Sequence, residues 1–390
     1  SIGGTIDGGI GTDRVAADAE DLDGNAMSFA NGLSNFEELE VQNQVDLMAA
    51  GATMVTVDVG ELGFDFVVTN GIQMSDDAGD ALILDEMADG GTVVLSGESD
   101  TTGSTQVNVT NAGATGENDN VLNVVVGAPN DTSGGPRELG TLLANDVETI
   151  AVDVNQSFDT SGTSDVEVAQ NLEIDANSVE EITLEGSGQL NLTTMNAGGL
   201  TSVNASGMDD TLTHMTTEVG LTVTGGSGDD NLTAGTKDVT LLGGAGEDTL
   251  TVGGGIDNVD LTGGEGEDIF DFDGVASEVS ASAGIADLSS GDTIDLSGLG
   301  TINGFQTNEV TGVTGDSTGD RAEQAVSGLN MGEAGWFQLG GSTFIVADLD
   351  GNPTFDGGAD FLVEIEGQEV DLAGQASFND NGTLQFFDIA

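Results

Sequence analysis

The sequence predicts an all-β fold: a β-roll or β-solenoid with a β-rich N-terminal part and a small C-terminal β cap that carries one short helix. A glycine-rich motif recurs at a spacing of about 20 residues, and self-similarity at a fixed period is the signature of stacked repeats. Between the motifs, short apolar runs alternate with polar residues. This alternation indicates strands that turn one face inward.

The three best copies of the motif G-G-x-G-x-D-x-U, in which U is a large apolar residue, begin at Gly225, Gly243 and Gly263. Glycines permit a positive φ, so carbonyl oxygens can turn toward one point. The aspartate adds a carboxylate, and Ca²⁺ takes about six to eight oxygen ligands. We therefore expect several Ca²⁺ ions between stacked turns, held by Gly225, Gly228, Asp230, Gly243, Gly246, Asp248, Gly263, Gly266 and Asp268.

Weaker copies extend this pattern toward the N-terminus. An isolated copy gives three further candidate ligands, Gly8, Gly11 and Asp13. One further repeat back from Gly225 reaches 205–212, which keeps the aspartate as Asp210 and the apolar residue as Leu212, and a second reaches 185–192. This constant register predicts one solenoid of about five turns with calcium mainly toward its C-terminal end.

A second acidic loop lies between apolar runs near the C-terminus. Its oxygen-bearing side chains are typical of calcium loops, although it lacks the final glutamate and the flanking helices of an EF-hand. The alternative is a solvated hairpin loop. The candidate ligands here are Asp348, Asp350, Asn352, Asp356 and Asp360.

We divide the chain into a β-rich domain at 1–150, the roll at 151–285, and a cap at 286–390. The first part could be an irregular solenoid or a separate β-sandwich, with strands expected at 36–41, 54–59, 64–68, 93–95, 107–109 and 121–126. The cap should hold a helix at 320–329, with an aspartate able to cap it, and antiparallel strands at 336–339, 342–346 and 361–365. A cap covers the open edge of a solenoid.

Composition restricts the partners. The chain has 70 acidic and 4 basic residues, for a net charge of −66. Nucleic acid and membrane insertion are therefore not expected, since no basic surface and no long apolar run can form. The acids lie in motifs, which favours bound calcium over adaptation to high salt alone as the reason for the charge. Cysteine is absent, so disulfides and thiolate metal sites are excluded.

Signals of catalysis are weak. The single histidine, His214, lies in a degenerate repeat, where we expect it on the surface. Neither a metalloprotease H-E-x-x-H motif nor a G-x-S-x-G nucleophile elbow is present. We therefore predict a protein that is not an enzyme.

The nonapeptides resemble those of the RTX (repeats-in-toxin) family. This resemblance implies a secreted, extracellular protein that folds with calcium and uses the type I secretion machinery. The segment that joins 291–296, 336–346 and 358–360 is similar to the C-terminal region of alphaproteobacterial S-layer proteins of RTX type. That similarity implies self-assembly into a cell-surface lattice. The alternatives are an extracellular filament subunit, an adhesin or module that binds cell-surface polysaccharide, and the non-catalytic tail of a secreted enzyme.

Overall fold

The computed structural model divides the chain into two compact units, unit 1 (Ser1–Asp210) and unit 2 (Thr211–Ala390). The predicted boundary after residue 150 falls inside a strand, Thr149–Val154. The structure describes residues 6–7, 13–18, 33–34, 38–42, 45–46, 54–59, 66–69, 72–73, 81–96, 103–110, 112, 119–127, 136–156, 158–159, 166–253, 258–272, 283–300, 302–310, 317–355, 360–379, 382–387 and 389.

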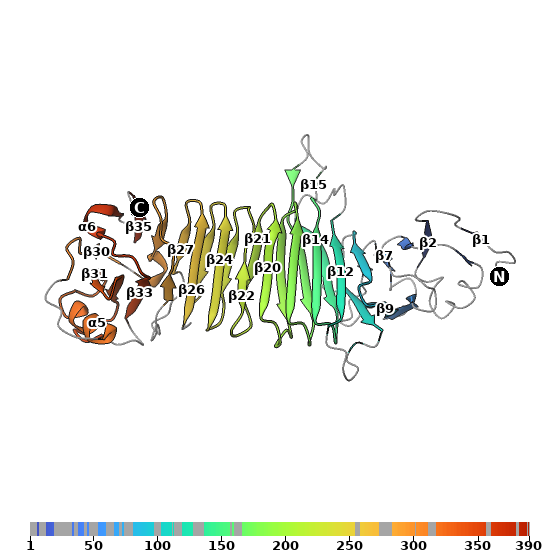
Figure 1. Ribbon diagram of the computed structural model, residues 1–390, viewed down its shortest axis with the longest axis horizontal. Coiled ribbons are helices and arrows are strands. Elements are labelled where there is room, and N and C mark those ends of the chain that lie inside the picture. The colour runs from blue at the N-terminus through green and yellow to red at the C-terminus, as the bar shows by residue number, and fades with distance from the viewer. Residues whose placement is uncertain are drawn as a thin grey trace. The chain divides into compact units, whose positions relative to one another are not determined.

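Unit 1 is a stack of coils whose strands alternate between two parallel sheets (Figure 1). The first sheet has the order β2-β4-β7-β10-β12-β14-β18-β20, and the second has the order β6-β9-β11-β13-β17-β19. The strands are β1 (Ile6–Asp7), β2 (Arg14–Asp18), β3 (Leu33–Ser34), β4 (Glu38–Gln42), β5 (Val45–Asp46), β6 (Met54–Asp58), β7 (Phe66–Thr69), β8 (Ile72–Gln73), β9 (Ala81–Met87), β10 (Thr92–Leu95), β11 (Ser104–Val109), β12 (Val121–Val126), β13 (Arg137–Leu143), β14 (Thr149–Val154), β15 (Phe158–Asp159), β16 (Val166–Glu167), β17 (Gln170–Asp175), β18 (Glu181–Gly186), β19 (Leu190–Met195) and β20 (Ser202–Met208).

The apolar side chains of unit 1 stack in register from coil to coil. In β12 every second residue is buried, and Leu122 and Val124 lie opposite Ile150 and Val152 of β14. At most inward positions a β-branched or leucine side chain fills the space between the two sheets. The described strands of each sheet in unit 1 pair in parallel with their neighbours, as in a solenoid. A sandwich would have antiparallel sheets.

Unit 2 begins with coils of the same kind and ends in a cap. Its first sheet has the order β22-β24-β26-β28-β33-β32-β31-β30, and its second has the order β21-β23-β25-β27-β29-β35-β34. The elements are β21 (Leu212–Met215), β22 (Thr222–Thr224), β23 (Asn231–Ala234), β24 (Val239–Ala245), β25 (Thr249–Val252), β26 (Val259–Glu265), β27 (Ile269–Asp271), β28 (Ala283–Ile285), β29 (Thr293–Asp295), η1 (Ser297–Leu299), β30 (Gly304–Phe305), α5 (Thr318–Val326), β31 (Glu333–Leu339), β32 (Ser342–Asp348), β33 (Phe361–Ile365), α6 (Leu372–Gln375), β34 (Ala376–Phe378) and β35 (Thr383–Phe386).

The cap confirms the three predicted antiparallel strands, because β32 pairs antiparallel with both β31 and β33. Phe337 and Phe344 stack with ring centroids 5.1 Å apart beneath α5. The helix begins two residues earlier than predicted, since Ser317 rather than Asp320 is its N-cap and accepts the Asp320 N–H at 3.2 Å. A second short helix, α6, was not predicted.

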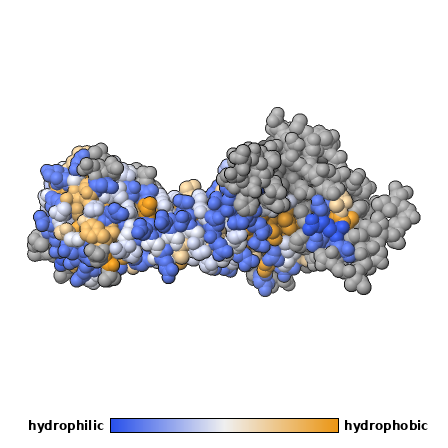
Figure 2. Space-filling view, turned by 90° about the horizontal axis from the view of Figure 1, so that it is seen from above, coloured by the Kyte–Doolittle hydropathy of each residue, from blue (hydrophilic) through white to orange (hydrophobic). Residues whose placement is uncertain are grey.

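Hydrophilic residues cover most of the coloured face in Figure 2, and apolar residues gather over the C-terminal end. Met331 and Phe387 of the cap are 64% and 40% exposed. Within the part of the chain that the structure describes, no helix is both long and apolar enough to cross a membrane.

Candidate metal centre

The nonapeptide turns join the first sheet of unit 2 to its second sheet. Glycines are required in them because the turns stack with almost no space between backbones. Gly244 and Gly246 adopt φ of 120° and 127°, which L side chains avoid. A Cβ on Gly246 would collide with the carbonyl oxygen of Gly228, and one on Gly266 with that of Gly246. The turns therefore present their carbonyls to the next coil.

Four buried aspartates form a ladder along this edge. The Oδ1 atom of each one accepts the main-chain N–H at the equivalent position of the preceding coil. Asp248 accepts the Asp230 N–H at 2.8 Å, and Asp268 accepts the Asp248 N–H at 2.9 Å. At the two ends, Asp230 accepts the Leu212 N–H at 2.6 Å and Asp292 accepts the Asp268 N–H at 3.0 Å. We call these four aspartates the aspartate ladder.

The two inner members of the ladder keep one carboxylate oxygen free. Oδ2 of Asp248 and Oδ2 of Asp268 are buried and accept no hydrogen bond. A Cβ added to Gly243 would collide with Oδ2 of Asp248 and lie 2.5 Å from the carbonyl oxygen of Gly263. A Cβ on Gly225 would meet Oδ2 of Asp230 and the carbonyl oxygen of Gly243 in the same way. Each glycine thus leaves open a space that carboxylate and carbonyl oxygens face.

The carboxyl groups in this space resist ionisation. Burial raises the pKa of Asp248 to about 6, against the lowering effect of its hydrogen bond from Asp230, and the charge of Asp230 raises it further. Burial likewise raises the pKa of Asp268 to about 6, with Asp292 and Asp248 as charged neighbours. Burying a carboxylate without a partner costs free energy, so a cation at these oxygens would offset that cost.

At the outer members of the ladder, Oδ2 also accepts a main-chain hydrogen bond. Oδ2 of Asp230 accepts the Gly226 N–H, and Oδ2 of Asp292 accepts the Ser289 N–H, both at 2.6 Å. Asp287 makes a similar contact with the neighbouring turn, since its two carboxylate oxygens accept the N–H groups of Gly263 and Gly264, each at 2.9 Å.

Sequence reasoning missed two of these aspartates, Asp287 and Asp292. A signal for Asp292 was present, because it stands two residues before the buried Ile294 as Asp268 does before Phe270. Asp287 carried no comparable signal, since its role depends on stacking against Gly263.

Asp210 does not lie on the ladder, and the predicted constant step between repeats is wrong there. β21 pairs with β23 so that His214 lies opposite Leu232, which places Leu212 opposite Asp230. Asp210 instead raises the pKa of Glu167, as a smaller effect than the burial of Glu167. The same register makes the surface prediction for His214 wrong, because that side chain points inward and is 2% exposed.

The isolated N-terminal copy is only partly visible. Gly8 and Gly11 lie outside the described residues, whereas Asp13 immediately precedes β2 and is half-buried. The carbonyl oxygen of Asp13 accepts the Glu38 N–H at 3.1 Å, which joins it to the next coil. Its role as a calcium ligand stays a prediction.

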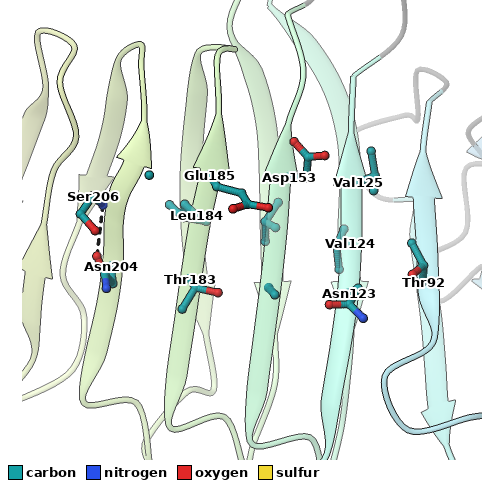
Figure 3. A pocket seen from close by; sticks show the side chains of 13 residues that line it. Thr92, Asn123, Val124, Val125, Asp153, Thr183, Leu184, Glu185, Asn204 and Ser206 are labelled. Atoms are coloured by element: carbon teal, nitrogen blue, oxygen red, sulfur yellow. Dashed lines mark hydrogen bonds between the residues drawn. The ribbon is translucent and has the colours of Figure 1, made fainter.

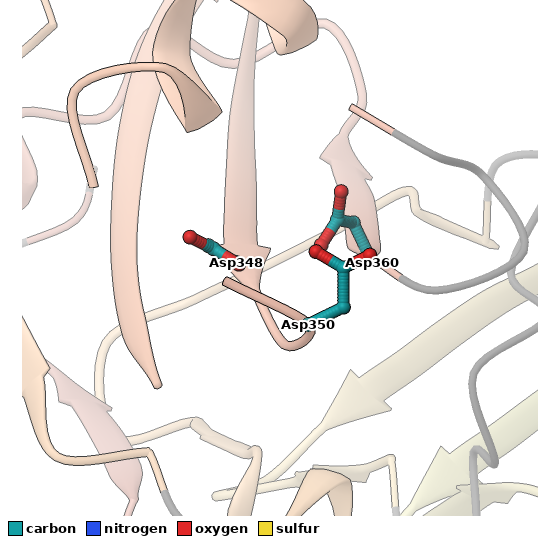
Figure 4. A group of neighbouring side chains, drawn as sticks. All are labelled: Asp348, Asp350 and Asp360. Atoms are coloured by element: carbon teal, nitrogen blue, oxygen red, sulfur yellow. The ribbon is translucent and has the colours of Figure 1, made fainter. Parts of the chain in front are cut away.

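The second acidic loop brings three of its five predicted residues together (Figure 4). One carboxylate oxygen each from Asp348, Asp350 and Asp360 lies within 4.8 Å of the other two. Asp348 and Asp360 are buried, and they accept the N–H groups of Gly351 and Leu349. Asn352 donates its N–H to Asp350 at 2.6 Å, and Asp356 lies outside the described residues.

The donor set on the aspartate ladder fits a hard divalent cation, since it offers carboxylate and carbonyl oxygens and no nitrogen or sulfur. Asp230, Asp248 and Asp268, with the carbonyls of Gly243 and Gly263, would hold Ca²⁺ between coils. A bound ion supplies positive charge that neutralises the buried carboxylates and joins adjacent turns. The fold and this site together define a calcium-binding β-roll.

Comparison with known families agrees with this class. The family model of the RTX calcium-binding nonapeptide repeat (4 copies) matches residues 224–259. Residues 224–259 therefore form RTX-type calcium-binding nonapeptide repeats, and these repeats bind Ca²⁺. Repeats of this type are typical of secreted extracellular proteins. No curated protein matches the chain.

Proposed function

We propose that this chain is an extracellular structural protein that self-assembles into a surface lattice, an S-layer, when Ca²⁺ orders its roll. The observation that carries the proposal is the aspartate ladder, whose inner carboxylates are buried and partly unpartnered. Without a cation these groups oppose the stacking of the coils. Calcium binding therefore stabilises the stacked coils of the roll.

Assembly follows from the charge of the folded protein. At a net charge of −66, copies of this chain repel one another unless divalent cations neutralise the facing surfaces. Ca²⁺ in the extracellular medium then has two roles, ordering the roll and bridging subunits. The exposed Met331 and Phe387 of the cap supply apolar area for a contact.

We also propose that the loop of Asp348, Asp350 and Asp360 holds a further Ca²⁺. Two of its carboxylates are buried, and one oxygen from each of the three aspartates lies within 4.8 Å of the other two, a spacing at which one cation can bind all three. The variant Asp350→Ala should remove one calcium site in titration calorimetry and leave the sites of the ladder intact. An unchanged number of sites would exclude this loop.

Electron microscopy of the purified chain, with and without millimolar Ca²⁺, tests the assembly. An ordered sheet that appears with Ca²⁺ and is lost on chelation is the expected result, with Mg²⁺ as the control cation. Fibres would instead support the filament alternative, because head-to-tail contacts that do not close produce fibres. Monomers that persist at high Ca²⁺ would exclude assembly. An unchanged β signal in circular dichroism after EGTA would exclude calcium-dependent folding.

A module that binds polysaccharide is the second candidate, and one observation favours it. A groove of about 570 Å³ lies on the outer face of the first sheet of unit 1, across β10, β12, β14, β18 and β20 (Figure 3). Thr183 and Asn204 lie opposite each other in register there, with the carboxylates of Asp153 and Glu185 alongside. Hydrogen-bonding groups at the strand spacing of about 4.8 Å suit a neutral sugar chain.

Binding of neutral polysaccharides to the purified chain and to the variants Thr183→Val and Asn204→Ala tests this candidate. Weaker binding by both variants would support the groove as the site. Equal binding by all three proteins would exclude it.

A further inference from the structure

The aspartate ladder has a counterpart in unit 1 that uses donors instead of acceptors. Each second-sheet strand from β13 to β29 has one inward position at its first residue or immediately before it; we call this the entry position. In unit 2 it is occupied by Leu212 and by the four aspartates of the ladder. In unit 1 the register of β13, β17 and β19 aligns Arg137, Gln170 and Leu190 at this position. All three side chains are buried.

Arg137 and Gln170 bind the carbonyls at the ends of first-sheet strands directly. Nη1 of Arg137 donates to the carbonyl oxygen of Ser96 at 2.8 Å, just beyond β10. Nε2 of Gln170 donates to the carbonyl oxygen of Asn155 at 2.7 Å, just beyond β14. In unit 2 the carbonyls of Gly243 and Gly263 instead face carboxylates, and a cation between them can bind both kinds of oxygen.

The positive charge of Arg137 interacts with a main-chain carbonyl at the end of a first-sheet strand. It is one of 4 basic residues in the chain, and within the described residues it forms no ion pair with a carboxylate. Its side chain is 4% exposed. A buried guanidinium is retained only where nearby dipoles or charges stabilise it, and a carbonyl group has such a dipole. Among the described residues, Nε of Arg137 and Oε1 of Gln170 have no hydrogen-bond partner; they are a donor and an acceptor on neighbouring coils.

We infer that Arg137 and Gln170 close the coils of unit 1 without metal, with the Arg137 guanidinium in the place that Ca²⁺ takes in unit 2. The calcium requirement is thereby confined to the aspartate ladder. β12 to β19 are equally stable in calcium-free medium, whereas the buried carboxylates destabilise the nonapeptide coils there until the ion binds. Arg137 is a positioning residue, since it acts on the backbone of the coil and on no ligand.

Hydrogen exchange of the full chain, measured by mass spectrometry in EGTA and in millimolar Ca²⁺, tests the inference. Peptides within 137–154 and 170–195 should be protected equally in both media, whereas peptides within 230–252 and 259–271 should exchange about tenfold or more faster in EGTA than in Ca²⁺. A similar acceleration of both regions in EGTA would overturn the inference, and so would unchanged exchange of both regions.

Variants separate Arg137 from the rest of the coil. Arg137→Met, which removes the donor at similar volume, should speed exchange of peptides within 137–154 by about tenfold or more in both media, because Ca²⁺ cannot replace the guanidinium. Gln170→Met is the milder variant and removes one neutral hydrogen bond. Arg321→Met is the control, since Arg321 donates to the carbonyl oxygen of Gln338 in the cap and should leave 137–195 unchanged. Unchanged exchange in both Arg137→Met and Gln170→Met, or rescue of either by Ca²⁺, would refute the assignment.

Discussion

The variant Asp248→Asn should change stability in opposite directions with and without calcium. The amide keeps Oδ1 as acceptor for the Asp230 N–H and replaces the unpartnered Oδ2 by an NH₂ group near the carbonyl oxygen of Gly263. In calcium-free medium at pH 7.5 the variant no longer buries a charge. With Ca²⁺ it lacks a charged ligand between two coils.

The magnitude follows from the raised pKa of Asp248. A shift from 3.8 to about 6 corresponds to at most about 3 kcal/mol of cost to the ionised form. Solvent screening at the edge of the roll reduces this to about 1–2 kcal/mol, which the variant should regain in EGTA. Loss of a charged ligand should lower calcium affinity by about tenfold or more, which removes about 1.4 kcal/mol or more at saturating Ca²⁺.

Thermal unfolding followed by circular dichroism, in EGTA and in millimolar Ca²⁺, measures both effects. The matched control is Asp229→Asn. Asp229 is exposed and accepts the Glu247 N–H at 2.8 Å, so its variant should stay within about 0.5 kcal/mol of the native chain in both media. An Asp248→Asn variant less stable than the native chain in EGTA would refute the reasoning, since the free carboxylate would then not oppose folding.

The other predictions concern pH, the glycine spaces and the Asp292 end of the ladder. The pKa values of Asp248 and Asp268 are raised above their unfolded value of 3.8, so the stability they contribute to the calcium-free roll is fully present below pH 3.8 and is lost as pH rises through about 6. Unfolding in EGTA should therefore show a roll that is more stable at pH 5 than at pH 7.5. Equal stability at the two pH values, or higher stability at pH 7.5, would contradict the burial of these groups. Gly243→Ala should destabilise the roll by about 1–3 kcal/mol and weaken calcium binding in calorimetry, because its Cβ meets Asp248 and Gly263, whereas Gly198→Ala, with open space around it, should do neither. Asp292→Ala should cost about 1–3 kcal/mol in EGTA as well as in Ca²⁺, since it leaves the N–H groups of Asp268 and Ser289 without acceptors; a loss seen only with Ca²⁺ would make Asp292 a ligand instead.

Local sequence determined the turns and the strand faces. The pattern G-G-x-G-x-D-x-U located Asp230, Asp248 and Asp268, all of which are buried at the entry position. Alternation also predicted the strand at 121–126 with both ends correct. Both features are local. Glycine tolerates the positive φ that a tight turn requires, and side chains in a strand point alternately to its two faces.

Tertiary structure decided which residues lie above one another. Asn231, Thr249, Ile269 and Thr293 occupy equivalent positions, so each of these coils is longer than the one before it. A constant step therefore misplaced Asp210 and missed Asp292. Coil length varies freely at the turns, while the buried apolar residues must stay in register, so packing rather than spacing fixes the alignment.

The glycine-aspartate motif by itself thus determined that this chain binds calcium in a β-roll, because a few adjacent residues supply both the required backbone conformations and the oxygen donors. Only the stacked coils decided where the ladder begins and ends. The stacking also decides that Asp287 faces backbone N–H groups and that Arg137 faces a carbonyl, because in both cases the partner belongs to a different coil, far away in the chain.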